Sequence, residues 1–203
     1  MQATPRRQRL NPTVTEQARR AQIVAAAIET IAELGYTRAS FAQIAKRARL
    51  SSTGLISYHF TSKQELDREI VAELFGRISR HMHAAMAGMA DPMSALAAYI
   101  RGLIGFMRID PFALQALTGI AMHGGFDYDA DAERGAVSEI GRILEWGQAE
   151  GVFRDFDIQV MATTIQRSLD GIPMAQMTNP SLDLDAYARE LVQLFTLATQ
   201  TRG

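Results

Sequence analysis

Apolar residues recur at helical spacing along most of this 203-residue chain, and polar or glycine-containing breaks separate the runs. In the first run, from about Glu16 to Leu34, the apolar positions fall on one helix face, and Gly35 stands where glycine commonly ends a helix. No stretch of useful length alternates apolar and polar residues as a half-buried strand does. The pattern predicts an all-α fold of about nine helices, over about 16–34, 40–48, 54–60, 62–86, 91–107, 110–124, 130–150, 157–177 (interrupted at Gly171 and Pro173) and 183–200.

Two of the predicted helices are short and follow one another closely. Ser40 opens the first, whose apolar residues recur at i, i+3, i+4 and i+7, and a polar break at Arg49, Ser51 and Ser52 separates it from Gly54–Phe60. A serine before each helix is suited to cap its N-terminus. Two short helices joined by a tight turn form a helix-turn-helix, whose second helix can enter the DNA major groove. The pattern therefore indicates a DNA-binding protein.

Charge is distributed unevenly between the two parts of the chain. Residues 1–60 carry nine Arg or Lys and three acidic residues, a net charge of +6, whereas the remainder carries twelve basic and nineteen acidic residues, a net charge of −7. Such asymmetry is typical of a protein that meets a polyanion with its N-terminal part only. Residues 1–15 have no periodicity and read as a mobile basic arm. Its arginines either insert into the minor groove or only keep the terminus soluble, and the sequence leaves both possibilities open.

Four sequence blocks stand in a characteristic order: A-E-L-G-Y at 32–36, S-F-A-Q-I-A at 40–45, L-I-S-Y-H-F at 55–60 and S-K-Q-E-L at 62–66. As a set they resemble the DNA-binding head of the TetR family of transcriptional regulators, over roughly residues 17–75. The resemblance implies that residues 52–59 face the groove, that Tyr58, His59 and Lys63 touch phosphates, and that Ser52, Thr53 and Ser57 reach base edges. The full set of expected DNA-contacting residues is Ser52, Thr53, Gly54, Ser57, Tyr58, His59, Lys63, Ser40, Arg38, Arg6, Arg7 and Arg9.

The resemblance also implies that successive parts of the chain have different functions. We expect a basic mobile arm at 1–15, a three-helix DNA-binding domain with the helix-turn-helix at 16–62, and a helical effector-binding and dimerisation domain at 63–203. The helices of this last part are rich in methionine and aromatic residues, which either fill the core or line a ligand cavity between helices. Polar groups expected to orient a ligand are Tyr99, Gln115, Gln166 and Arg167. The residues expected to contact the ligand are Ile78, Met82, Tyr99, Leu103, Phe106, Phe112, Trp146, Ile165 and Gln166.

A homodimer is expected because one short recognition helix reads few base pairs, and two copies on a palindrome are the usual solution. The last two long helices each carry an apolar stripe, so a four-helix bundle from two protomers would bury both. The interface residues expected from these stripes are Met161, Leu169, Leu191 and Phe195.

Several classes of function find no support in the residues. The chain has no cysteine, which excludes disulfides, thiolate metal sites and a cysteine nucleophile. It has no phosphate loop, hydrolase elbow or Rossmann glycine pattern, and no window apolar over the length of a bilayer. We therefore expect a cytoplasmic protein that is not an enzyme, with no cofactor, metal or membrane partner.

The combined expectation is a homodimeric repressor that binds double-stranded DNA and is released by a small, mostly apolar effector. A constitutive DNA-binding or architectural protein without an effector is the main alternative, and a core without a cavity would favour it. A helical enzyme is the remaining class.

Overall fold

The computed structural model describes residues 14–123 and 130–201, with the side chains of 130–134 excepted. The arm residues Arg6, Arg7 and Arg9 therefore lie outside the described residues. Within these two segments the chain forms helices and no strand; one isolated bridge joins Phe153 and Gln200. The helices are α1 Val14–Leu34, α2 Phe41–Arg47, α3 Gly54–His59, α4 Lys63–Met86, α5 Pro92–Ile109, α6 Pro111–His123, α7 Ala130–Ala149, α8 Ile158–Asp170, α9 Ile172–Thr178 and α10 Leu184–Thr199.

The all-α expectation is confirmed, and the helix expected over 157–177 is two helices in the described structure. Gly171 ends α8 and also precedes α9, whose first turn contains Pro173. Proline has no N–H to donate and its ring crowds the preceding turn, so α8 cannot continue through it. Because of this division, the described residues form ten helices where the periodicity predicts nine.

Side-chain caps explain where several helices begin. The side chains of Ser40, Ser62, Asp91, Asp157 and Asp183 each accept a backbone N–H from the first turn of the helix that follows. The expectation of a serine cap before α3 is wrong. Thr53 holds that position, and its own backbone is already helical (φ −65°, ψ −21°), so its side chain makes no capping hydrogen bond.

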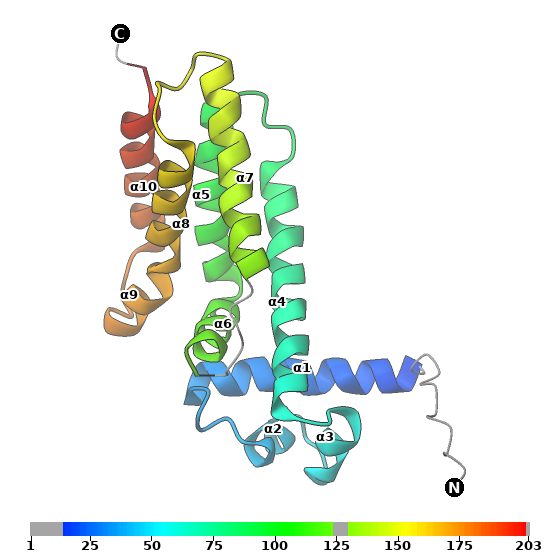
Figure 1. Ribbon diagram of the computed structural model, residues 1–203. Coiled ribbons are helices and arrows are strands. Elements are labelled where there is room, and N and C mark those ends of the chain that lie inside the picture. The colour runs from blue at the N-terminus through cyan, green and yellow to red at the C-terminus, as the bar shows by residue number, and fades with distance from the viewer. Residues whose placement is uncertain (1–13, 124–129, 202–203) are drawn as a thin grey trace, which may run out of the picture.

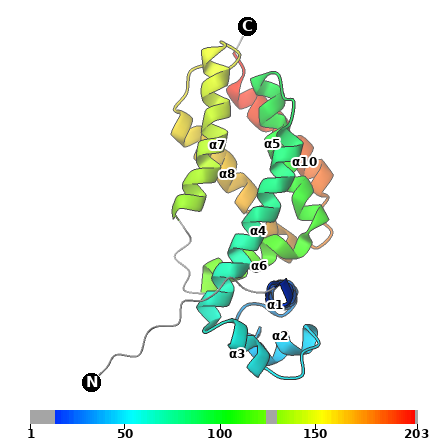
Figure 2. The same ribbon diagram turned by 90° about the vertical axis from the view of Figure 1, so that its right-hand side faces the viewer.

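The helices form a head and a body, which meet at α1 (Figure 1). α1 lies across the end of the body, with α2 and α3 on its far side, and α4 rises from the head into the body beside α5 and α7 (Figures 1 and 2). α6 lies at the base of the body against α1. None of the described helices combines the length and apolar character needed to cross a membrane.

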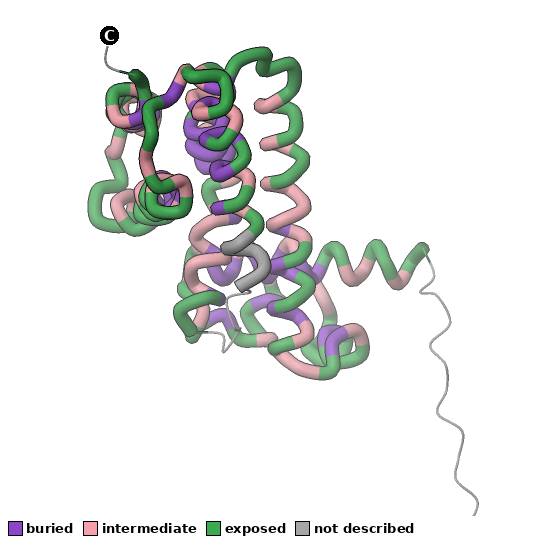
Figure 3. The backbone as a smooth tube through the Cα atoms, turned by 45° about the horizontal axis from the view of Figure 1, so that its top comes forward, coloured by how far each residue is buried: buried purple, intermediate pink, exposed green. Residues whose placement is uncertain are grey.

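Two clusters of buried side chains hold these parts together, and the buried positions lie where helices face one another (Figure 3). The head core contains residues of α1, α2 and α3, but also Leu66, Ile70 and Leu74 of α4 and Ala116 and Ile120 of α6. The body core joins α5, α7, α8 and α10. Because α4 and α6 contribute to the head core and also flank the body, they physically connect the two parts.

Close contact between α6 and the head depends on a glycine. A Cβ at Gly119 would lie 3.3 Å from Cγ2 of Ile31 and 3.7 Å from Cβ of Tyr36. The absence of a side chain thus lets α6 approach α1 and the turn that follows it. Any displacement of α6 would therefore change its packing against Ile31 and Tyr36 of the head.

Candidate functional site

The recognition helix α3 has one buried and one exposed side. Ile56 is fully buried, and Phe60 at the C-terminal cap is 1% exposed, so these two residues attach α3 to the head core. Thr53, Gly54 and Ser57 are exposed. Because the anchoring residues and the exposed residues lie on different sides of a six-residue helix, α3 presents a small polar surface to solvent.

Two aromatic residues stand at the end of this surface. The Tyr58 side chain is 72% exposed, and the ring of His59 meets it edge-on, with centroids 5.1 Å apart and an interplanar angle of 86°. His59 is half-buried. Ser52, immediately before the helix, is exposed. The exposed residues predicted to contact DNA within 52–59 therefore form one continuous patch.

Arg20 of α1 holds the C-terminal end of α3 in place. Its guanidinium donates to the carbonyl oxygen of His59, lies 4.2 Å from the ring centroid of Phe60, and pairs with Glu69 of α4 at 3.1 Å. Gln22 donates to the carbonyl oxygen of Ala48 at 2.7 Å, which attaches the turn between α2 and α3 to the same helix. α1 thus serves as the support on which the recognition helix is oriented.

Lys63 begins α4 beside this patch, and its ammonium group is held by Tyr36. Nζ lies 3.1 Å from the carbonyl oxygen of Tyr36 and 3.7 Å from its ring centroid. The Tyr36 hydroxyl in turn donates to Oδ2 of Asp67 at 2.7 Å. An ammonium has three donors, so Lys63 keeps hydrogen-bonding capacity for a phosphate while Tyr36 positions it.

Asp67 is an acid in the head core. It is 2% exposed, and its Oδ1 has no hydrogen-bond partner in the described structure. Burial raises the pKa of Asp67, although the hydrogen bond from Tyr36 and the charge of Lys63 oppose this change. Burial, and then the hydrogen bond and charge of Asp67, raise the pKa of the Tyr36 hydroxyl. Sequence periodicity did not reveal this pair, because the two residues are 31 positions apart.

The two other expected contacts of the head, Arg38 and Ser40, lie immediately before α2. Ser40 caps α2 by accepting the backbone N–H of Gln43 at 3.3 Å, and Arg38 donates from Nε to the carbonyl oxygen of Leu34 at 2.6 Å. Both side chains are exposed. Each therefore has a local structural role on a surface that remains accessible.

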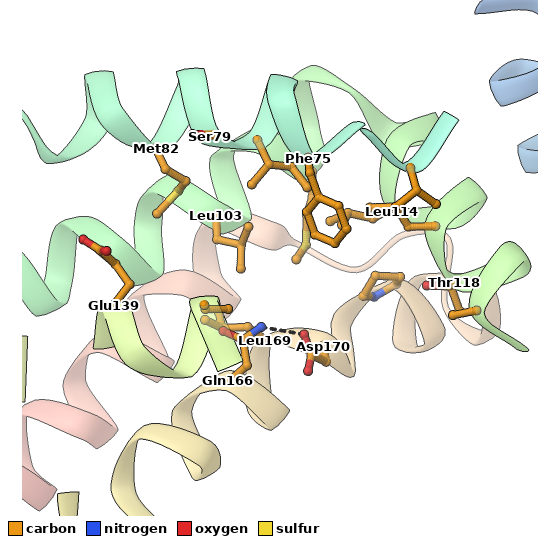
Figure 4. A pocket seen from close by; sticks show the side chains of 18 of the residues that line it. Phe75, Ser79, Met82, Leu103, Leu114, Thr118, Glu139, Gln166, Leu169 and Asp170 are labelled. Atoms are coloured by element: carbon orange, nitrogen blue, oxygen red, sulfur yellow. Dashed lines mark hydrogen bonds between the residues drawn. The ribbon is translucent and has the colours of Figure 1, made fainter. Parts of the chain in front are cut away.

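A cavity of about 1060 Å³ lies in the body between α4, α5, α6, α7 and α8. Most of its wall is apolar, and methionines from α4, α5 and α6 contribute to it. Five of the expected ligand-contacting residues line it, namely Ile78, Met82, Tyr99, Leu103 and Gln166, as does Arg167. Figure 4 shows Phe75, Ser79 and Met82 of α4 along one wall and Gln166, Leu169 and Asp170 of α8 along the other.

The other four expected ligand-contacting residues do not line this cavity. Phe106 and Phe112 pack against the head core, and Ile165 and Trp146 belong to the body core or pack against it. Gln115 does not line the cavity either. Periodicity identifies the apolar face of a helix. A wide apolar face can contact both a neighbouring helix and a cavity, and only the packing of the helices determines which of its residues line the cavity.

The polar end of the cavity contains residues that sequence reasoning missed. The Tyr99 hydroxyl donates to Oε1 of Gln166 at 3.4 Å. Nε2 of Gln166 in turn donates to Oδ1 of Asp170 at 2.7 Å (Figure 4). Glu139 of α7 also lines the cavity. Burial, and then the charges of Glu139 and Asp170, raise the pKa of Tyr99, so its hydroxyl stays neutral. No local motif signals this group, because its members come from three helices.

The expected dimer interface needs a correction. Leu169 is fully buried and Phe195 is 3% exposed within the chain's own core, so neither can contact a partner. The exposed apolar residues of α8 and α10 are instead Val160, Leu194 and Leu197, at 63%, 55% and 61% exposure. Met161 and Leu191 are half-buried at the edge of the core. The apolar stripes thus led to the selection of Leu169 and Phe195, which face the core, whereas nearby residues of the same helices are the ones exposed to solvent.

Comparisons with known proteins agree with this architecture. The sequence model of the protein family described as bacterial regulatory proteins, tetR family, matches residues 23–70. The HTH-type transcriptional regulator BetI of Escherichia coli K12 is 34% identical over 102 residues, which make up 48% of this chain and 51% of that protein. The chain thus matches about half the length of its curated relatives.

Solved structures resemble nearly the whole chain in fold. A putative transcriptional regulator from Saccharomonospora viridis, crystallised in complex with choline, has a TM-score of 0.80 and 22% identity over 92% of this chain and 100% of its own. A TetR transcription regulator from Haloarcula marismortui has a TM-score of 0.78 and 18% identity over 91% and 100%. The fatty acid degradation regulator FadR of Bacillus halodurans has a TM-score of 0.73 and 24% identity over 87% and 93%. Residues 23–70, which contain the helix-turn-helix, are thus similar to the tetR family of bacterial regulatory proteins, and the fold of nearly the whole chain resembles that of solved transcriptional regulators.

Proposed function

We propose that this regulator is a cytoplasmic repressor that binds a palindromic operator in double-stranded DNA as a homodimer, and that a small, mostly apolar effector releases it. It acts by binding and catalyses no reaction. The observation that carries the proposal is the cavity of about 1060 Å³, because two of the helices that form it, α4 and α6, are also part of the head core. A ligand there can act on the head through residues that already touch both parts.

DNA binding is assigned to the exposed patch of α3 and the residues beside it. Ser52, Thr53 and Ser57 carry short hydroxyl side chains suited to base edges, and Tyr58 and Lys63 are suited to phosphate oxygens. The net charge of +6 on residues 1–60 favours approach to DNA. The proposal includes a DNA-binding domain that ends at residue 62 and a basic arm at residues 1–15 that assists DNA binding.

The dimer is assigned to the exposed apolar residues of α8 and α10. Val160, Leu194 and Leu197 would leave water on pairing with a second copy, and an adjacent shallow groove of about 380 Å³ is lined by Leu191, Leu194 and Leu197. Two such helices from each protomer would form a four-helix bundle. A symmetric pair of heads then matches a palindromic site.

Release requires that the ligand prefer a spacing of the heads that DNA does not accept. Two recognition helices must lie about 34–36 Å apart to enter successive major grooves. Both α4 and α6 contribute to the cavity wall, and α6 also lies against Ile31 and Tyr36 of the head. A tenfold preference for the released state corresponds to about 1.4 kcal/mol, and switching from 1:99 to 99:1 needs about 5.5 kcal/mol. The solved relative from Saccharomonospora viridis holds choline, which supports a small organic ligand for a body of this fold.

The DNA contacts can be tested with a duplex selected from a random pool and with unselected duplex. Affinity should fall steeply with salt, with a slope near −0.9 on logarithmic axes for each phosphate contact. Lys63→Gln should weaken binding to both duplexes and reduce the slope by about one, whereas Thr53→Ala should act mainly on the selected duplex. Arg101→Gln, which removes an exposed charge from α5, is the matched control. Equal affinity at low and high salt would exclude this DNA-binding function.

The effector response can be tested after a thermal-shift screen of apolar and amphipathic metabolites. A ligand that releases DNA must bind more weakly to the DNA-bound protein, by the same factor as it weakens DNA binding. Leu103→Trp, which fills the cavity, should abolish the response while DNA binding persists. A ligand affinity that is identical with and without saturating duplex would instead favour a constitutive DNA-binding protein.

A further inference from the structure

The charged residues of the cavity are predominantly acidic. Glu139 of α7 and Asp170 of α8 line it, and Arg167 is the one lysine or arginine among its described lining residues. Arg167 forms an ion pair with Asp170 at 3.0 Å, and its side chain is 52% exposed. Arg142, which pairs with Glu139, lies outside the cavity lining and is 69% exposed. The side chains of Glu139 and Asp170 are themselves 47% and 34% exposed, so solvent screens both ion pairs in part, and both acids contribute to the cavity wall.

We propose that the cavity selects an amphipathic organic cation, an amine or quaternary ammonium group on an apolar body, with its charge held by Glu139 and Asp170. This inference rests on the effector cavity proposed above and specifies the chemical class of its ligand.

The surroundings of the two carboxylates support a cation. After burial, the charges of Glu139 and Asp170 are the next causes that raise the pKa of Tyr99, so both carboxylates lie near its hydroxyl. Gln166, which is 7% exposed, donates to Asp170 and fixes the orientation of that carboxylate. Tyr99 and Phe75 also line the cavity, and aromatic rings attract cations. An anion at the same place would meet two carboxylates, and Arg167 already pairs with one of them.

The remainder of the cavity fits an apolar body. Leucines, methionines and Phe75 make up the wall from α4, α5 and α6, and methionine adapts to ligands of varied shape. A volume of about 1060 Å³ exceeds what a small ammonium ion alone would fill. The ligand should therefore carry several carbon atoms beyond its charged group.

Two probes that differ only in charge can test this inference on the full-length protein. (6-Hydroxyhexyl)trimethylammonium is a cation, and 7,7-dimethyloctan-1-ol replaces its nitrogen with carbon. Titration calorimetry should show the cation binding at least about tenfold more tightly, a preference of about 1.4 kcal/mol. Decanoate serves as the anionic probe and should bind more weakly than the cation. Equal or weaker binding of the cation, or binding of none of the probes, would overturn the inference.

Matched variants locate the source of the preference. Glu139→Gln combined with Asp170→Asn should abolish the preference for the cation while leaving affinity for the neutral alcohol within about twofold, because shape is preserved and charge is removed. Glu145→Gln, on the exposed side of the same helix as Glu139, is the control and should change neither affinity. Arg167→Gln should strengthen cation binding, since it removes a competing positive charge. A loss of cation binding in Arg167→Gln would contradict this electrostatic reasoning and overturn the inference.

DNA release is measured separately, so that the two proposals can fail independently. A cation that binds selectively but leaves duplex binding unchanged contradicts the proposed repressor switch and supports the cation-selective cavity. A neutral or anionic compound that binds the cavity in preference to the cation and releases DNA supports the switch and overturns the inference about charge.

Discussion

Gly147 lies in α7, where the ring of Phe153 packs directly against its backbone. A Cβ at this position would lie 2.5 Å from the ring Cγ and closer still to Cδ2 and Cε2, far inside the normal contact distance of about 3.5–4.0 Å. Phe153 is 3% exposed in the body core, and its backbone N–H donates to the carbonyl oxygen of Gly147 at 2.9 Å. Gly147→Ala should therefore force the ring or the helix to move.

The magnitude follows from two opposing contributions. Alanine in a helix interior is more favourable than glycine by about 0.5–1 kcal/mol. Overpacking a core costs about 1–3 kcal/mol, and complete expulsion of the ring would approach the cost of a Phe→Ala substitution, about 3–5 kcal/mol. The net loss in unfolding free energy should be about 1–4 kcal/mol. For a chain of this size each kcal/mol corresponds to a Tm shift of about 2–4 °C.

Gly141→Ala is a matched control in the same helix. Its Cβ would lie 3.8 Å from Cγ2 of Ile158, which is an ordinary contact. This variant should be neutral or more stable by up to about 1 kcal/mol, because it gains helix propensity without overlap. Circular dichroism during thermal and urea unfolding measures both variants at one protein concentration, since association also affects the apparent stability.

A double-mutant cycle with Phe153→Ala identifies the cause of the loss. When the ring is absent, Gly147→Ala should no longer destabilise the protein, so the two substitutions should be clearly non-additive. If Gly147→Ala proves as stable as Gly141→Ala, or if its cost is unchanged without the ring, the packing argument is refuted.

Further predictions concern association, the buried acid of the head and the N-terminal support of α3. Leu194→Glu should give monomers in sedimentation velocity, because an unpaired charge would enter the proposed interface, whereas Ile109→Glu, at an exposed site outside it, should remain dimeric. Burial raises the pKa of Asp67, so the folded state favours its protonated form and loses stability as pH rises through the raised pKa. Asp67→Asn should therefore gain stability relative to wild type in urea unfolding as pH rises from the ordinary range of an aspartate pKa through the raised pKa; a pH-independent difference would contradict this. Arg20→Gln should weaken duplex binding without removing a groove-facing residue, because α3 loses its link to α1; unchanged affinity would argue against that support.

The sequence by itself determined the features that depend on short-range physics. The caps at Ser40, Ser62, Asp91 and Asp157 fix where helices begin, because the side chain and the N–H groups that it satisfies are only a few residues apart. Gly35 and Gly151, with φ of +80° and +69°, end helices because glycine adopts this left-handed conformation without steric cost. The helix-turn-helix and its exposed polar patch follow from the same local rules.

Only the tertiary structure decided which side of each apolar face meets a core, a cavity or solvent. Leu194 and Phe195 are consecutive apolar residues of α10, yet Leu194 is 55% exposed and Phe195 is 3% exposed. Likewise, Phe106 and Leu103 share α5, but Phe106 packs in the head core and Leu103 lines the cavity. Successive helical residues are rotated by about 100°, so a rotation of the helix by that angle would give each residue the environment of its neighbour. That rotation is set by all the neighbouring helices together, and no local pattern contains it.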